Sequence, residues 1–229
     1  VFPWVFSSAY ILRIVTVCMM YVMIALSLNL LTGFLGLMTL GQAAFWGIGA
    51  YTAAILATQM GWGMGMCMIA SALMAGLLSL LVALPTMRLK GYFLTVVTLG
   101  FCEIVRLVEM NWMDLTRGPL GIAGIPSPNF FGIDLSSNRQ IYYVMLVLVV
   151  VSAVIIFSIV HSRVGLAIMA IRDDDLAAAS MGVNVVKYKI MVFLISTMMV
   201  GVAGAFYAHY ISFIDPSGFT TAASTDMLI

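Results

Sequence analysis

The sequence predicts an all-α fold, a polytopic bundle of transmembrane helices with a short helix in a water-exposed loop. Of the 229 residues, 63% are hydrophobic and only 8% are charged, whereas soluble domains carry about 25% charged residues. The apolar runs are long and continuous, which disfavours the short strands of a membrane barrel. Many of the few charges are concentrated between His161 and Lys189. These observations place the chain in a lipid bilayer.

Six apolar segments are long enough to cross a bilayer, whose hydrocarbon core of about 30 Å needs roughly 20 helical residues. Turns rich in Gly or Pro separate most of them. The first residue is Val and the last residues resemble the start of another span. We therefore expect a single membrane domain over residues 1–229 that is a fragment, incomplete at both ends. The expected spans are 10–32, 41–59, 64–85, 92–112, 140–160 and 189–211, followed by a seventh that begins after Asp215 and Pro216.

Small residues recur at four-residue spacing on the second span, as Gly49, Ala53 and Ala57, and on the sixth, as Gly201 and Ala205. In lipid, small side chains allow helix backbones to approach closely. This spacing predicts tight packing of the spans that carry it.

Basic residues are unevenly divided between the two ends of the expected spans. The loops at 86–91 and 161–189 lie at one end and carry six Lys and Arg, against three at the other end. Because cytoplasmic loops are enriched in Lys and Arg, segment 161–189 is predicted to be cytoplasmic. The loop at 113–139, with its turn-forming glycines and prolines, is then expected outside.

The chain has 10 basic and 9 acidic residues, and seven of these charged residues lie in segment 161–189. The segment's run of aspartates suits a helix N-terminus, because Asp caps exposed N–H groups and complements the helix dipole. A glycine suits the position just after a helix. The segment therefore predicts a short cytoplasmic helix with a smooth, Ala-rich surface, which either enters a cleft on another protein or only joins two spans. Its residues are Arg172, Asp173, Asp174, Asp175, Leu176, Ala177, Ala178, Met181 and Gly182.

The fourth span carries Glu103 and Arg106, which lie three residues apart and can pair on one helix face. Ionisable residues inside a span are costly and suggest a functional path, so the pair is a candidate for the translocation path. The alternative is a structural pair near the outer boundary, with Glu109 among the lipid headgroups.

Neither an enzymatic nor a metal site is expected. His161 and His209 fall at opposite ends of their spans, so they cannot form one metal site or a Ser–His dyad. No Gly-rich phosphate loop ending in Lys-Ser or Lys-Thr occurs, so any ATP hydrolysis belongs to another subunit. The net charge of +1 gives no indication of nucleic-acid binding, and no cofactor is expected.

Several segments resemble a known family. RVGLAIMAIRDDDLAAASMGVNVVKYK at 163–189 is similar to the cytoplasmic loop of bacterial branched-chain amino acid ABC transporter permeases of the LivM type. LSLNLLTGFLGLMTLGQAAFWGIGAYTAA at 26–54, GYFLTVVTLGFCEIVRLVEMNWMDLTRGPLGI at 91–122 and GVAGAFYAHYISFIDPSGF at 201–219 agree with it in the same order. One departure is Arg117, where the family usually has Gly.

The resemblance implies a multi-pass protein of the bacterial cytoplasmic (inner) membrane that forms the translocation path of an ATP-driven importer. Its implied partners are a second permease subunit, two cytoplasmic ABC ATPases and an external solute-binding protein. The family's coupling helix would map onto residues 172–182. The implied substrates are branched-chain or related small amino acids, although urea, amide and aromatic acid importers share much of the pattern.

Two other functions stay open on the residues alone. One is an ion-coupled secondary transporter that uses Glu103 and Arg106 as its coupling site, and the other is a scaffold subunit that transports nothing. Co-purification of an ATPase would favour the importer over the ion-coupled transporter, and deletion of a scaffold would leave uptake intact.

Overall fold

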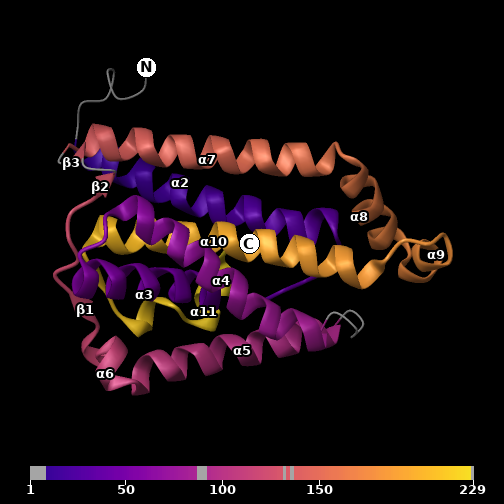
Figure 1. Cartoon of the computed structure of the whole chain (residues 1–229), viewed down its shortest axis with the longest axis horizontal. Coiled ribbons are helices and arrows are strands. Elements are labelled where there is room, and N and C mark those ends of the chain that lie inside the picture. The colour runs from indigo at the N-terminus through magenta and orange to yellow at the C-terminus, as the bar shows by residue number, and fades with distance from the viewer. Residues whose placement is uncertain (1–8, 87–91, 131–132, 135–136, 228–229) are drawn as a thin grey trace.

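The computed structural model describes residues 9–86, 92–130, 133–134 and 137–227, and its architecture is a bundle of long helices (Figure 1). Each of the six expected spans coincides with a long helix, to within about four residues at each end, which confirms the all-α class. The long helices are α2 (Ala9–Asn29), α3 (Gln42–Met60), α4 (Met64–Thr86), α5 (Tyr92–Asn111), α7 (Asn138–Val160) and α10 (Val185–Ile211).

Four segments combine the length and the apolar composition needed to cross a membrane, as far as the described residues extend. They are Tyr10–Phe34, Met64–Thr86, Asn138–Val160 and Val185–Ile211, with mean hydropathies of 2.2, 2.4, 3.0 and 2.0. Helices α3 and α5 are nearly as long but less apolar. Helix α5 carries three charged side chains, and most of α3 is buried inside the bundle.

The α2 helix does not end in a simple turn. It continues into a π-helical turn, η1 (Leu30–Phe34), and residues 35–41 then run back without regular structure to the start of α3. As Figure 1 shows, α3 begins part-way along the bundle rather than at its end. Irregular backbone at membrane depth is tolerated where protein buries it, and here Leu30, Leu31 and Leu35 are almost fully buried.

Helices α3, α4 and α10 meet at a seam of small residues. A methyl group built on Gly49 would collide with the backbone of Gly201, and one on Gly204 would collide with the carbonyl of Trp46. The Ser71 hydroxyl of α4 donates to the Gly49 carbonyl at 2.8 Å. The predicted close packing of small residues is therefore confirmed, and α10 is the central helix of this packing.

The turn-rich elements lie at the end of the bundle opposite α8 and α9 (Figure 1). Strand β1 pairs antiparallel with β4, joining the loop after α5 to the segment after α10, and β2 pairs with β3. These elements are α6 (Met113–Thr116), η2 (Gly118–Leu120), β1 (Ile122–Ala123), β2 (Asn129–Phe130), β3 (Ile133–Asp134) and β4 (Phe213–Ile214).

The departure at Arg117 has a structural consequence. Arg117 has φ 59°, and the three glycines that follow, Gly118, Gly121 and Gly124, also have positive φ. This left-handed region suits glycine, which has no Cβ to clash with the backbone. Arg117 carries a Cβ and therefore adopts this conformation at some cost.

The chain after β4 forms η3 (Pro216–Gly218) and a short helix, α11 (Thr221–Asp226), which packs against α3 and α5. The seventh span expected after Pro216 stays a prediction.

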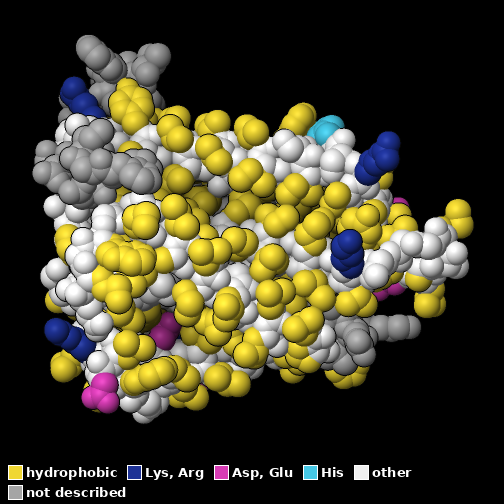
Figure 2. Space-filling view, in the orientation of Figure 1, with side chains coloured by type: hydrophobic (Ala, Val, Ile, Leu, Met, Phe, Trp, Pro, Cys, Tyr) yellow, Lys and Arg dark blue, Asp and Glu magenta, His cyan; other side chains and the backbone are white. Residues whose placement is uncertain are grey.

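On the face shown in Figure 2, most of the charged side chains lie toward the two ends of the bundle, and many hydrophobic side chains cover the surface between them. His161 caps the end of α7 beside α8, whereas His209 lies in the last turn of α10 at the other end, so the predicted separation of the histidines is confirmed. The predicted cytoplasmic location of segment 161–189 stays a prediction. Two of its supporting residues, Arg88 and Lys90, lie outside the described residues.

Candidate functional site

The polar segment forms an arm of two helices, α8 (Arg163–Asp173) and α9 (Asp175–Ser180), which projects from one end of the bundle (Figure 1). Asp174 is extended between them, and its carboxylate accepts hydrogen bonds from the N–H groups of Leu176 at 2.8 Å and Ala177 at 3.1 Å. Gly182 follows α9 with φ 86°. The predicted short helix, its Asp cap and its terminal glycine are confirmed.

The expected start of this helix near Arg172 is wrong, because Arg172 and Asp173 form the last turn of α8. The Ser162 side chain caps α8 by accepting from the Val164 N–H at 3.2 Å. Gly165, Ile168 and Ile171 are buried at three-residue spacing on one side of α8. This amphipathic pattern makes α8 a separate helix, and the extended Asp174 breaks the chain before α9 begins.

Two polar contacts hold the arm to the bundle. Lys189 of α10 is buried and forms an ion pair with Asp175 of α9. On the other side, the Arg172 guanidinium donates from Nη1 to the Gly33 carbonyl in η1 at 3.0 Å. The arm is therefore connected to α10 through one contact and to the end of α2 through the other.

The arm exposes apolar side chains at its tip. Leu176 is 70% exposed and Met181 is 86% exposed, in a segment that is otherwise polar or small. Ala178, by contrast, is 5% exposed and is buried against the apolar core. A partner that docks on α9 would therefore meet Leu176 and Met181, whereas Ala178 fixes the helix to its own chain.

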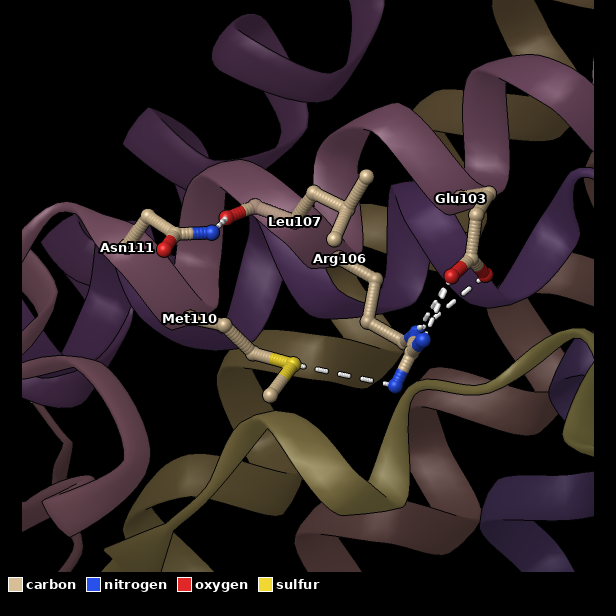
Figure 3. A network of polar contacts seen from close by, with 5 residues as sticks. All are labelled: Glu103, Arg106, Leu107, Met110 and Asn111. Atoms are coloured by element: carbon tan, nitrogen blue, oxygen red, sulfur yellow. Dashed lines mark hydrogen bonds and ion pairs between the residues drawn. The ribbon is translucent and has the colours of Figure 1, made fainter.

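The predicted pair of Glu103 and Arg106 forms on the side of α5 (Figure 3). The Arg106 Nε donates to both carboxylate oxygens of Glu103 at 3.2 Å, and its Nη1 contacts the Met110 sulfur at 3.7 Å. The side chains are 28% (Arg106) and 40% (Glu103) exposed, so the pair is partly accessible in this chain. Its charges are mutually compensated, and neither residue lines the groove described next.

Helices α3, α4 and α5 enclose a groove of about 660 Å³, with α3 as its floor. Glu109 of α5 lies in its wall and is only 4% exposed, and neither of its carboxylate oxygens has a hydrogen-bond partner among the described residues. The expectation that Glu109 lies among the headgroups is therefore wrong. Glu109 is the functional candidate that sequence reasoning missed.

The spacing of residues along α5 could have predicted that Glu109 faces inward. Cys102, Val105 and Glu109 occur at i, i+3 and i+7, so they share one face of α5. Cys102 is buried and Val105 packs against the core, which places Glu109 on the inward face of the helix. Glu103 lies about 100° around the helix from Cys102, on a different face, and its greater exposure follows from that.

Aromatic side chains surround the carboxylate of Glu109. A methyl group built on Gly47 would lie 2.7 Å from Glu109 Oε1 and 3.1 Å from Phe219 Cγ, so both contact the same point of α3. Phe219 also packs edge-on against Trp46 and Tyr51, with ring centroids 5.0 and 5.9 Å apart. The buried Tyr51 hydroxyl likewise lacks a hydrogen-bond partner among the described residues.

A second set of buried polar residues lies where η1 gives way to α3. The Ser27 and Ser196 hydroxyls are 2.7 Å apart, and Gln42 donates to Ser196 at 3.5 Å. Leu40 N–H donates to the Thr98 hydroxyl at 3.2 Å. These contacts connect α2, α3, α5 and α10 around the irregular segment, where Thr39 Oγ1 and Gln42 Oε1 are buried without a partner among the described residues.

Comparison with known proteins agrees with this architecture. Residues 10–229 match the family described as "Branched-chain amino acid transport system / permease component". The chain belongs to this family. Since the family is one of permease components and several of the described helices are strongly apolar, the chain is an integral membrane protein.

Two curated relatives are similar over most of the chain. Both are named high-affinity branched-chain amino acid transport system permease protein LivM; the one from Escherichia coli K12 is 37% identical and the one from Salmonella typhimurium LT2 is 35% identical. Each match covers 94% of this chain but 56% of the relative, so the chain spans about half the length of these relatives. No solved structure gives a significant match.

Proposed function

We propose that the chain is the membrane-spanning permease subunit of an ATP-driven importer for branched-chain or related small amino acids in the bacterial inner membrane. Family membership supports the transport role, and the substrate named for both relatives supports the amino-acid class. The observation that carries the ATP-driven part is the α9 arm, which presents Leu176 and Met181 to a partner while polar contacts fix it to two helices.

The proposed partners are a second permease subunit, two cytoplasmic ATPases and an external solute-binding protein. ATP binding and hydrolysis on the ATPases would move α9, because α9 is the docking element. The Lys189–Asp175 pair would carry that movement to α10, and the Arg172 contact would carry it to η1. Helix α10 packs along α3 and α4, so the packed helices would shift between inward-open and outward-open arrangements.

Docking is tested by replacing the exposed tip of the arm. In the assembled transporter, Leu176→Ser combined with Met181→Ser is expected to lose co-purification of the ATPases and ATP-driven uptake, because the apolar contact is removed. Met60→Ser is the matched control, since Met60 is 62% exposed at the end of α3, far from the arm. Full retention of the ATPases and of uptake by the double variant would overturn the docking role. Ala178 is unsuitable for this test because it is buried.

The substrate class and the energy source are tested together. Proteoliposomes that contain the complete transporter should accumulate labelled leucine, isoleucine or valine when ATP is supplied. Accumulation of labelled urea but none of these amino acids would contradict the proposed substrate. Uptake that follows a proton or sodium gradient without ATP would instead support the ion-coupled alternative.

A further inference from the structure

The groove between α3, α4 and α5 is lined almost entirely by aliphatic and aromatic side chains. Its polar groups are those of Tyr51, Thr52, Glu109 and Thr116 and the indole N–H of the exposed Trp112. The Thr52 hydroxyl donates to the Ile48 carbonyl at 2.7 Å, and the Thr116 hydroxyl donates to the Glu109 carbonyl at 2.7 Å. Two buried groups of the lining therefore keep unused polar atoms among the described residues, the Glu109 carboxylate and the Tyr51 hydroxyl.

An unpaired carboxylate is expensive to bury. Removing a carboxylate from water costs several kcal/mol unless a cation or several hydrogen bonds compensate for it, or the group is held neutral by a proton until a cation arrives. Within the described residues, the ion pairs involve Glu103, Asp173 and Asp175 but not Glu109. Glu109 is also held firmly in place, because its Oε1 lies close to Gly47 and Phe219. A fixed, buried and unpaired carboxylate in a cavity indicates a site for a positively charged group.

The residues around Glu109 indicate which class of positively charged ligand would bind there. Tyr51 lies one helical turn after Gly47 on the same face of α3, so its hydroxyl offers a donor near the carboxylate. The remaining lining includes Leu56, Val105 and Val108, which suit an aliphatic side chain. A binding site for an aliphatic amino acid requires three parts. These are an acceptor for the ammonium group, a donor for the carboxylate and an apolar wall for the side chain.

We infer that this groove holds a transient binding subsite for the transported amino acid, with its ammonium group on Glu109, its carboxylate at the Tyr51 hydroxyl and its side chain against the apolar wall. The inference rests on the proposed function, since it assigns the amino acid to this chain. In this inference Glu109 and Tyr51 contact the substrate in the translocation path, whereas Glu103 and Arg106 lie outside that path. A cation from the second permease subunit is the competing occupant.

The test compares two carboxylates of α5 in the complete transporter, reconstituted with its ATPases, second permease and binding protein. Glu109→Gln keeps the shape but removes the charge, so uptake of labelled leucine should fall by about tenfold or more. Glu109→Asp should recover part of the uptake because it restores the charge. Glu103→Gln is the matched control, since Glu103 lies on the same helix but outside the groove, and its uptake should stay within about twofold of wild type. Tyr51→Phe, which removes only the hydroxyl, should lower uptake by about threefold.

Each outcome is informative. Equal uptake by Glu109→Gln and Glu103→Gln, or unchanged uptake by Tyr51→Phe, would overturn the subsite. Loss of the second permease subunit from purified Glu109→Gln, but not from Glu103→Gln, would also overturn it and make Glu109 a subunit contact. If the wild-type transporter takes up no labelled amino acid, the proposed function itself fails, which is a different result from failure of the subsite alone.

Discussion

The α9 arm and the Glu109 groove differ in whether their ionisable side chains have partners. In the arm, Asp174 caps a helix, Asp175 pairs with Lys189 and Arg172 bonds to a carbonyl, so the charges hold the arm in place. At its tip the arm exposes the apolar side chains of Leu176 and Met181. In the groove most side chains are apolar, and the carboxyl group of Glu109 is left without a partner among the described residues. In the proposed transporter, the arm would dock through Leu176 and Met181, whereas the groove would bind through its unpaired polar atoms.

The largest effect is expected from Gly47→Ala, which acts on the groove without changing any charge. The added methyl group would lie 2.7 Å from Glu109 Oε1 and would displace the carboxylate. Leucine uptake should fall by about tenfold, as expected for the loss of a charge-assisted contact. Gly100→Ala is the control, because a methyl group there meets nothing within 4 Å and favours the helix by up to about 1 kcal/mol. Equal uptake by the two variants would argue that the position of Glu109 is unimportant.

A smaller effect is expected from Lys189→Met, which acts on the attachment of the arm. Lys189 is buried, and its loss leaves Asp175 with only solvent for a partner. Because Asp175 is partly exposed, the loss is well below that of a fully buried pair, and uptake per ATP hydrolysed should fall by about threefold. Lys187→Met, at an exposed position on the same helix, should leave this ratio unchanged. A large fall for both would indicate a general effect of basic charge instead.

A weaker effect is expected from Arg172→Gln, which removes the contact with the Gly33 carbonyl. The contact is made by a partly exposed side chain, so uptake per ATP should fall by only about twofold. Comparing uptake per ATP in this variant and in Lys189→Met shows how much of the movement of the arm is transmitted to η1 and how much to α10. A larger loss for Arg172→Gln than for Lys189→Met would reverse the proposed order of the two connections.

The smallest effect is expected from neutralising the surface pair. Glu103→Gln combined with Arg106→Gln removes two charges that compensate each other at a partly exposed site. The free energy of unfolding should stay close to that of wild type, and uptake should match that of wild type. Thermal unfolding in detergent and leucine uptake check this. Loss of uptake with normal stability would restore Glu103 and Arg106 to the translocation path.

The sequence predicted the long helices well, because an apolar run of about 20 residues has few other structures available in a bilayer. It also predicted α9, since Asp174 and Gly182 act on their own helix through local hydrogen bonds and φ. Helix α8 was missed because its charges resemble a loop, although Gly165, Ile168 and Ile171 give it a buried side.

The burial of Glu109 could not be predicted from its position along the axis of α5. Burial depends on which face of the helix meets α3, and that face is set by close packing at Gly47 and by Phe219, far along the chain. The spacing from Cys102 gives only a partial signal. The break at η1 is equally non-local, since Leu30 and Leu31 read as an ordinary apolar run and only the packing around them shows a π-helical turn.

The central claim is that work done on α9 at one end of the bundle reaches the groove at the other end. The most direct measurement uses Val108→Cys, a half-exposed position in the groove wall, in a Cys18→Ala background where the remaining cysteines are buried. The rate of labelling by a water-soluble maleimide is measured in the assembled transporter with and without ATP. The rate should change with ATP, and the change should vanish in the Leu176→Ser and Met181→Ser background. The same rate under both conditions would contradict the claim.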